Sequence, residues 1–149
     1  MSMAIRLHFW RNTLPPGNPR RMIWHLMEVA MIQIKRVYDP VSKEDGKRFL
    51  VERLWPRGIK KEALHMARWC KEAAPSTDLR RWFGHDPAKW QEFKKRYQAE
   101  LAKNPSAWQP LLDAARSGNL TLLYSARDPE HNSACVLKLY VERKLAERL

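Results

Sequence analysis

The sequence predicts an α/β fold: a single three-layer α/β/α domain with a small, mostly parallel sheet of about four strands. Two apolar runs, residues 49–51 and 120–124, show almost no alternation with polar residues, which is typical of strands covered on both faces. Between these runs and after them, apolar residues recur at helical spacing. Strands that alternate with helices indicate a largely parallel sheet, and a length of 149 residues fits one domain.

The expected elements follow from these patterns and from the residues that interrupt them. Pro56 and Gly58 stop the second strand, because proline removes a ladder donor and glycine permits a tight turn. Ser76 or Thr77 caps a helix, and Gly84 ends it. The expected strands span residues 32–37, 48–54, 68–72 and 120–124. The expected helices span residues 59–66 and 77–83, followed by three that start after Asp86, after Asn104 and at Pro129.

Three Asx-Pro pairs set the starts of the last three helices. They are Asp86-Pro87, Asn104-Pro105 and Asp128-Pro129. In each pair, a side chain that can cap a helix precedes a proline whose fixed φ suits the first helical position. Apolar stripes at helical spacing follow, such as Trp90, Phe93, Tyr97 and Leu101 after the first pair. These stripes predict one core shared by the helices.

The first 30 residues show neither a helical nor a strand period. They contain the run Leu14-Pro15-Pro16-Gly17-Asn18-Pro19, and they lack the long apolar core and small-residue cleavage pattern of a signal peptide. We therefore expect residues 1–30 to be a poorly ordered N-terminal extension and residues 31–149 to form the domain.

The net charge of +12 belongs mainly to that domain, since four of the 28 basic residues lie in the first 30 positions. A basic domain can hold nucleic acid or a small anion, or simply stay soluble. The two cysteines show no disulfide framework, which fits a cytoplasmic location. The five histidines share no ligand spacing with cysteines or carboxylates, and no phosphate-binding glycine loop occurs, so we expect no metal and no cofactor. No apolar run approaches the length of a membrane span.

Polar residues that follow two of the predicted strands define a candidate site. In parallel sheets, ligands bind beyond the carboxyl ends of the strands, where helix N-termini also point. The expected ligand-binding residues there are Arg53, Arg57, Tyr124, Ser125 and Asn132. The expected catalytic acid–base residues are Glu52, Asp128 and His131, with Asn132 and His131 in the first turn of the last helix.

The sequence leaves a structural alternative open for each of these roles. Glu52 and Arg53 can form a buried ion pair that fixes the strand end. Asp128 can be a helix N-cap, with His131 donating to it or facing solvent. Arg57 can bond backbone carbonyls in its turn, and Tyr124 can pack in the core.

Several ordered motifs carry a resemblance to a known family. They are Ile-Lys-Arg-Val-Tyr-Asp-Pro at 34–40, Val-Glu-Arg-Leu-Trp-Pro-Arg-Gly at 51–58, Ala-Pro-Ser-Thr-Asp-Leu-Arg at 74–80, Trp-Phe-Gly-His-Asp-Pro at 82–87 and Leu-Leu-Tyr-Ser-Ala-Arg-Asp at 122–128, with His131-Asn132. Together they closely resemble the bacterial domain of unknown function 488, in its YeaO-like branch, over about residues 31–147. Similar proteins usually begin near Met31. The resemblance implies a fold and a set of site positions and names no reaction.

Two departures from the family pattern bear on the site. Many relatives outside this branch carry Asp where Glu52 stands, so the acidic role is retained on a longer side chain. Those relatives also carry a Cys-His-Arg run just after the position of His131, where this chain reads Asn132-Ser133-Ala134. Thiol or imidazole chemistry at that run is therefore not carried over, and nearby Cys135 is expected to be a buried apolar residue.

Two hypotheses follow. The first is a small cytoplasmic α/β enzyme, or former enzyme, that takes an anionic nucleotide or phosphorylated ligand on Arg53 and Arg57. The second is a non-catalytic domain that binds nucleic acid through a basic patch, namely Lys94, Lys95, Arg96, Arg80 and Arg81. The first is favoured because its residues converge on one site, whereas the second rests on charge.

Deletion of residues 1 to about 28 should leave the melting temperature nearly unchanged, because the segment shows no core stripe. Thermal unfolding of the full and shortened chains measures this. A loss of several degrees would show that the segment packs on the domain and that the expected boundary is misplaced.

Overall fold

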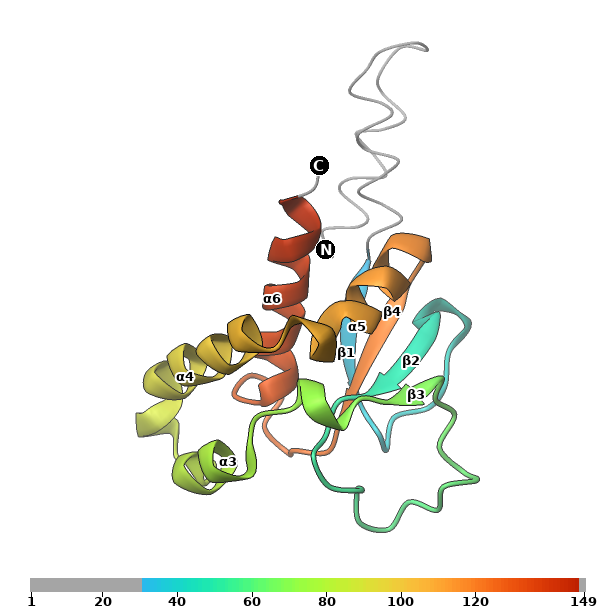
Figure 1. Ribbon diagram of the computed structural model, residues 1–149. Coiled ribbons are helices and arrows are strands. Elements are labelled where there is room, and N and C mark those ends of the chain that lie inside the picture. Colours follow the sequence, from blue (N-terminus) through green and yellow to red (C-terminus); the bar gives the residue numbers. More distant parts are fainter. Residues whose placement is uncertain (1–30, 148–149) are drawn as a thin grey trace, which may run out of the picture.

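The computed structural model describes residues 31–147 and contains one parallel four-stranded sheet (Figure 1). The strands are β1 (Ile32–Arg36), β2 (Lys47–Leu50), β3 (Arg68–Trp69) and β4 (Leu120–Tyr124). Their spatial order is β1-β4-β2-β3, and each neighbouring pair is parallel. The α/β class and the parallel four-stranded sheet predicted from the sequence are thereby confirmed. The expected extension, residues 1–30, lies outside the described residues.

Four α-helices accompany the sheet in the described part of the chain. They are α3 (Thr77–Phe83), α4 (Trp90–Lys103), α5 (Pro105–Ser117) and α6 (Ser133–Ala146). Single 3-10 turns cover Lys43–Asp45, Lys71–Ala73 and Pro87–Lys89. The caps predicted for α3 are present, since Ser76 Oγ accepts from the Leu79 amide at 3.2 Å and Gly84 ends the helix in a left-handed conformation.

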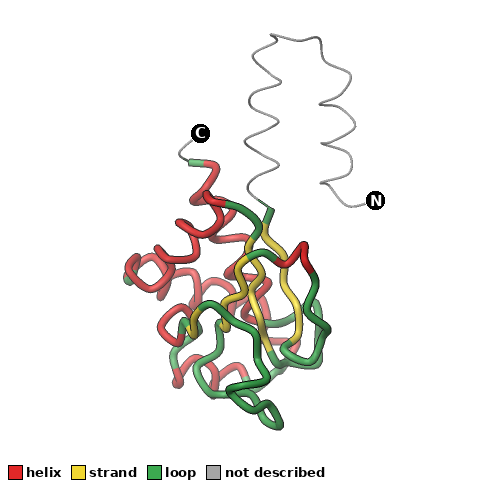
Figure 2. Tube along the Cα trace, turned by 90° about the vertical axis from the view of Figure 1, so that its right-hand side faces the viewer, coloured by secondary structure: helices red, strands yellow, loops and turns green. Residues whose placement is uncertain are grey.

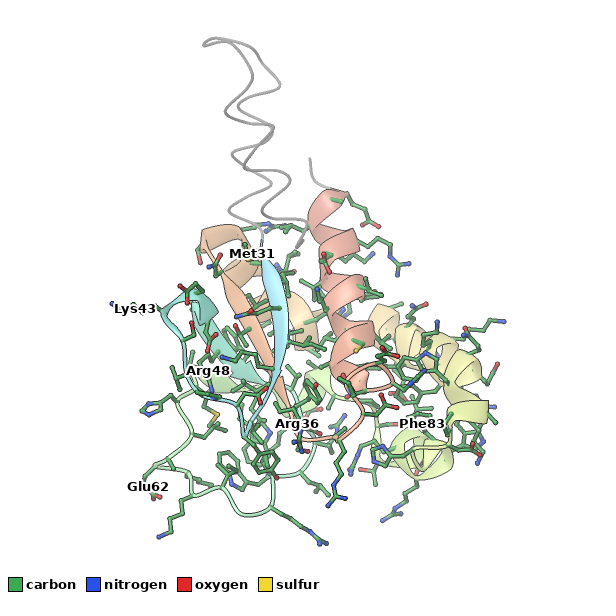
Figure 3. The ribbon with its side chains drawn as sticks, turned by 180° about the vertical axis from the view of Figure 1, so that it is seen from behind. Met31, Arg36, Lys43, Arg48, Glu62 and Phe83 are labelled. Carbon is green, nitrogen blue, oxygen red and sulfur yellow. The ribbon has the colours of Figure 1, made fainter. Side chains whose placement is uncertain are left out.

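The helices cover one face of the sheet and a loop covers the other. Side chains of alternate strand residues, including Ile32, Phe49 and Leu122, share a core with all four helices. Leu50 and Leu123 point to the opposite face, where they pack with Leu64. Figure 2 shows helices on one side of the strands and loop on the other, and in Figure 3 Phe83 and Glu62 mark these two sides. The layer opposite the helices is therefore formed mainly by the loop over residues 55–66.

This loop replaces the helix expected at residues 59–66, which the structure shows as turns. A helix that short is marginal in water, and here its apolar residues are recruited to the sheet instead. Ile59 and Met66 pack around Leu64, and the Trp55 indole donates to the Ile59 carbonyl at 2.6 Å. The second strand also stops earlier than expected, at Leu50 instead of residue 54, because its neighbour β3 is two residues long.

The last helix begins later than the Asp128-Pro129 pair predicted. Asp128 caps an isolated turn, with Oδ1 accepting from the amides of Glu130 at 2.9 Å and His131 at 3.1 Å. Asn132 takes the N-cap of α6 and accepts from the Cys135 amide at 3.0 Å. His131 and Asn132 therefore precede the helix and do not lie in its first turn.

A buried carboxylate, Asp45, organises the polar part of the loop-covered face. The residue is 1% exposed. Its carboxylate accepts from the side-chain amide of Gln33 at 3.0 Å and from the Lys35 ammonium at 3.0 Å. It also pairs with Arg48, whose Nε donates to the His65 carbonyl at 2.7 Å. Burial alone would raise the pKa of Asp45, but the bonds from the Ser42 amide, Lys35 and Arg48 outweigh it and hold the pKa below its usual value.

The turn into β2 requires a glycine at position 46. Gly46 has φ 62°, and a Cβ there would stand 2.1 Å from the Asn119 carbonyl oxygen. The close approach joins the start of β2 to the start of β4, since the Lys47 amide donates to the same carbonyl at 3.1 Å.

Replacement of Asp45 by Asn should destabilise the domain by roughly 3–5 kcal/mol at pH 7, because Arg48 and Lys35 lose a buried partner. The folded pKa of Asp45 is depressed, so this contribution is present above the unfolded value and is lost as pH falls through the folded one. Urea unfolding at several pH values should show the two proteins converging as pH falls below 3.8, the usual pKa of an aspartate.

The matched control is Asp113→Asn on the exposed surface of α5, where the carboxylate lies 3.7 Å from Arg116. We expect that change to cost less than about 0.5 kcal/mol. Equal effects of the two substitutions would contradict the organising role of Asp45.

Candidate functional site

A cavity of about 450 Å³ lies beyond the carboxyl ends of the strands β2 and β4. Its wall combines the segments after these strands with α3, α4 and the start of α6. The lining residues that carry polar or charged groups are Glu52, Thr77, Arg80, Arg81, His85, Ser125, His131, Asn132 and Ser133. The apolar ones are Leu54, Pro75, Phe83, Phe93 and Ala126. This is the edge where a parallel sheet and its helix N-termini are expected to hold a ligand.

Glu52 ties the ends of the two strands together at this cavity. Its Oε1 accepts from the backbone amide of Ser125 at 2.7 Å and from the Ser125 hydroxyl at 3.1 Å. The strand β2 has already ended at Leu50, so the side chain reaches across to the residue that follows β4. A carboxylate is the natural acceptor for two donors, and it sets the backbone at the floor of the cavity.

Asp128 and His131 form a pair beside the cavity. Besides its two amide bonds, Asp128 places Oδ2 2.9 Å from His131 Nδ1. The bond from the Glu130 amide, together with those from His131, lowers the pKa of Asp128 below its usual value. Because Nδ1 is engaged, Nε2 is the imidazole nitrogen that remains for a ligand. The ring of His131 also packs edge-on against Trp90, with 5.2 Å between ring centres.

The N-terminus of α6 reaches the same cavity through Asn132 and Ser133. Asn132 is buried, and its Nδ2 donates to the Asp128 carbonyl at 2.9 Å while its Oδ1 caps the helix. The turn that holds Asp128 and His131 is therefore fastened to the first turn of α6. Unpaired amides and the helix dipole at this end favour a negative charge.

The helix α3 contributes positively charged side chains to the wall of the cavity. Arg80 and Arg81 lie in its last turn, and His85 follows Gly84. His85 itself has φ 56°, an uncommon backbone conformation for a residue with a Cβ. Two successive left-handed residues reverse the chain after α3 and bring the imidazole over Phe83, with 6.0 Å between ring centres. Two guanidinium groups and two imidazoles thus share the wall with one carboxylate, Glu52.

The other predicted ligand residues lie elsewhere. Arg53 lines a second cavity of about 180 Å³ and donates to the carbonyls of Ala74 at 3.0 Å and Pro75 at 3.3 Å. The backbone carbonyl of Arg57 accepts from the Tyr38 hydroxyl at 2.9 Å, and the Arg57 side chain is exposed. Tyr124 is buried in the core, where burial raises its pKa. The structure therefore brings together Glu52, Ser125, His131 and Asn132, with Asp128 behind them, and separates Arg53 and Arg57 from this group.

The described residues were also compared with the requirements of a metal site and of a membrane-spanning helix. Within residues 31–147, no three His, Cys, Asp or Glu side chains are grouped so as to hold a metal ion. Over the same range, no helix combines the length and the apolar character that a membrane span requires. Cys70 and Cys135 are free thiols, and burial raises the pKa of both.

Comparison with known proteins identifies the family of the chain. A family model described as the inactive DUF488-N3 subclade matches residues 31–149. The chain belongs to the DUF488 family, in its YeaO-like branch.

Among curated DUF488 relatives, the uncharacterized protein YeaO of Escherichia coli (strain K12) is 49% identical over 106 residues, which is 71% of this chain and 92% of YeaO. The uncharacterized protein Rv3073c of Mycobacterium tuberculosis (strain ATCC 25618 / H37Rv) is 46% identical over 76 residues, which is 51% of this chain and 64% of that protein. No solved structure matches the chain.

The cavity lies at the sheet edge where the sequence predicted a site, but the prediction did not include its cationic wall. From the sequence, Arg80 and Arg81 were expected only in the basic patch of the nucleic-acid hypothesis. The available signal was the turn at Ala74-Pro75, which follows β3 and so starts α3 at the same edge as Glu52. The left-handed conformation of His85, which lines the cavity, has no sequence signal besides the preceding glycine.

Replacement of Arg53 by Met separates a structural role from a ligand role. The change keeps side-chain bulk but leaves the buried Ala74 and Pro75 carbonyls without their donor, so we expect a loss of about 1–3 kcal/mol. Chemical denaturation measures this cost, with Arg57→Met on an exposed side chain as the control. An Arg53→Met protein as stable as the control would contradict the structural role.

Proposed function

We propose that this DUF488 domain binds a small anionic ligand, a nucleotide or another phosphorylated molecule, in the cavity at the carboxyl edge of its sheet. The observation that supports this proposal is the shared wall formed by Arg80, Arg81, His85, His131 and the N-terminus of α6. Guanidinium groups provide forked donors that match phosphate oxygens, and a helix N-terminus adds amide donors of the same polarity.

The side chains of the wall are available for such a ligand. Among the described residues, the guanidinium groups of Arg80 and Arg81 enter no hydrogen bond or ion pair with protein, in contrast to Arg48 and Arg53. Both residues lie in α3, which Ser76 caps at its start and Gly84 at its end, so their backbone has a fixed position. Because the backbone is preformed, only the two side chains lose conformational entropy when a ligand binds.

Binding without turnover is the form of this function that the residues favour. Asp128 already accepts hydrogen bonds from two backbone amides and pairs with the His131 imidazole. Its lowered pKa also makes it a poor proton donor near neutral pH. Glu52 is committed through Oε1 to Ser125. The family model that matches the chain describes an inactive subclade, which agrees with a binding role. The two free cysteines favour the cytoplasm as the place where the domain acts.

The alternative of nucleic-acid binding rests on the basic surface of α3 and α4. Aromatic rings are present there, but cations already cover them: Arg96 lies 4.1 Å and Lys89 5.2 Å from the centre of the Trp82 ring. Lys94 lies 5.8 Å from the centre of the Trp90 ring. A base that stacked on these rings would have to displace a cation, which favours the cavity over the surface as the binding site.

The test compares Arg80→Gln and Arg81→Gln with Lys95→Gln, which removes the same charge from an exposed position on α4. Ribose 5-phosphate should raise the melting temperature of the unmodified protein and of Lys95→Gln by linkage. Each arginine variant should bind about tenfold more weakly or worse, because a charge-assisted hydrogen bond is lost. Calorimetric titration gives the affinities.

The melting temperature measured with oligonucleotides at two salt concentrations tests the alternative. If duplex or single-stranded nucleic acid stabilises the domain at physiological salt, and if Lys95→Gln weakens that effect as much as Arg80→Gln does, the surface is the site and the cavity proposal is wrong. Binding of phosphorylated ligands that none of the three variants alters would equally refute it.

A further inference from the structure

We propose, on the basis of the function proposed above, that the ligand is a mononucleotide. Its phosphate lies at Arg80, Arg81 and His131, its ribose hydroxyl groups face Glu52, and its base packs against Leu54. Two features of the cavity that an anion alone does not explain carry this inference, namely an exposed leucine at its rim and a carboxylate among its cations.

Leu54 is the first feature. It lines the cavity and is 62% exposed, among the most exposed large apolar side chains of the described residues. The lining of the same cavity also includes Pro75 and Ala126, so apolar surface is present beside the charged groups. A phosphate or a sugar phosphate would leave this area in water, whereas a flat base would cover it. A base on Leu54 thus accounts for an apolar residue at the mouth of a polar site.

Glu52 is the second feature. Its Oε1 is bound to Ser125, and among the described residues no donor reaches its other oxygen, Oε2. A negative charge in a cavity for anions opposes binding unless the ligand also brings hydrogen-bond donors. Paired ribose hydroxyls are such donors, and a carboxylate at the end of a strand is a known way to hold them in dinucleotide-binding sheets. The same carboxylate repels the negative charge of inorganic phosphate and sulfate, and neither of them brings a pair of neighbouring hydroxyl groups on a sugar ring.

The size of the cavity agrees with this ligand. Small-molecule sites span roughly 300–1,000 Å³, and about 450 Å³ places this cavity in the lower half of that range. The charged wall comes from α3 and the turn before α6, while Leu54 and Glu52 both follow β2. The groups suited to a phosphate and those suited to a ribose and a base therefore come from different segments of one cavity wall, as a nucleotide requires.

The experiment measures the affinities of adenosine 5′-monophosphate, ribose 5-phosphate and inorganic phosphate for the full chain by calorimetric titration. We expect the nucleotide to bind at least about tenfold more tightly than ribose 5-phosphate, since it alone covers Leu54. Leu54→Ser should remove most of that advantage and leave ribose 5-phosphate unaffected. Leu139→Ser, at a residue of α6 that is 64% exposed, is the matched control.

Glu52→Gln tests the carboxylate without releasing Ser125, because the amide oxygen still accepts its two donors. We expect this variant to bind inorganic phosphate severalfold more tightly and to lose part of its preference for a ribonucleotide over the 2′,3′-dideoxy analogue. A purely structural role for Glu52 would change neither of these ratios.

The outcomes separate this inference from the proposed function. Equal affinity for the nucleotide and ribose 5-phosphate, or an equal effect of Leu54→Ser on both, overturns the mononucleotide and leaves an anion site standing. If none of the three ligands binds, both proposals are wrong. A nucleotide preference that depends on Leu54 and Glu52, and not on Leu139, supports both.

Discussion

The burial of strand β4 on both faces and along both edges is the constraint on which the rest of the structure depends. β4 pairs with β1 on one side and β2 on the other, and each of its five residues is buried. Leu120 and Leu122 contact the helical core, whereas Leu123 contacts the loop-covered core. The polar exception, Thr121, donates to the Asp45 carbonyl at 2.7 Å. A strand so enclosed cannot shift in register, so the residue after it has a fixed position.

That fixed end determines where the site lies. Ser125 is the first residue beyond β4, and Glu52 binds its amide and hydroxyl from the segment after β2. Asp128 then closes a turn before α6, and Asn132 fastens that turn to the helix. The cavity is thus framed by hydrogen bonds that are attached to the most buried strand of the sheet. Its cationic side, by contrast, comes from a separate helix, α3.

The elements that the sequence predicted well are those that are buried on both faces or whose ends carry capping residues. β4 reads as an unbroken apolar run, and α3 has a serine cap and a glycine stop. The errors arose where long-range contacts override local preference. Residues 59–66 follow a helical pattern but fold as turns because Leu64 packs on Leu50 and Leu123.

In the site, the same limit applies. Glu52 and Ser125 were expected to lie together, and they do, because the ends of parallel strands share an edge. Arg53 pointed elsewhere because the nearby carbonyls of Ala74 and Pro75 offered it partners that no local sequence pattern reveals. Arg80, Arg81 and His85 join the cavity only through the path of the chain between β3 and α4, which depends on the packing of α3.

The unequal covering of the sheet has a consequence for hydrogen exchange. In residues 52–66, a single backbone amide, that of Ala63, donates to another backbone carbonyl of the described chain. Side-chain packing of Trp55 and Leu64 holds this segment, while regular hydrogen bonding protects the helices on the other face. Amides of the segment therefore exchange by local opening at low free energy, while those of β4 exchange on global unfolding. Leu54 belongs to the readily opened part, so the rim of the cavity can rearrange without disturbing the sheet that positions Ser125.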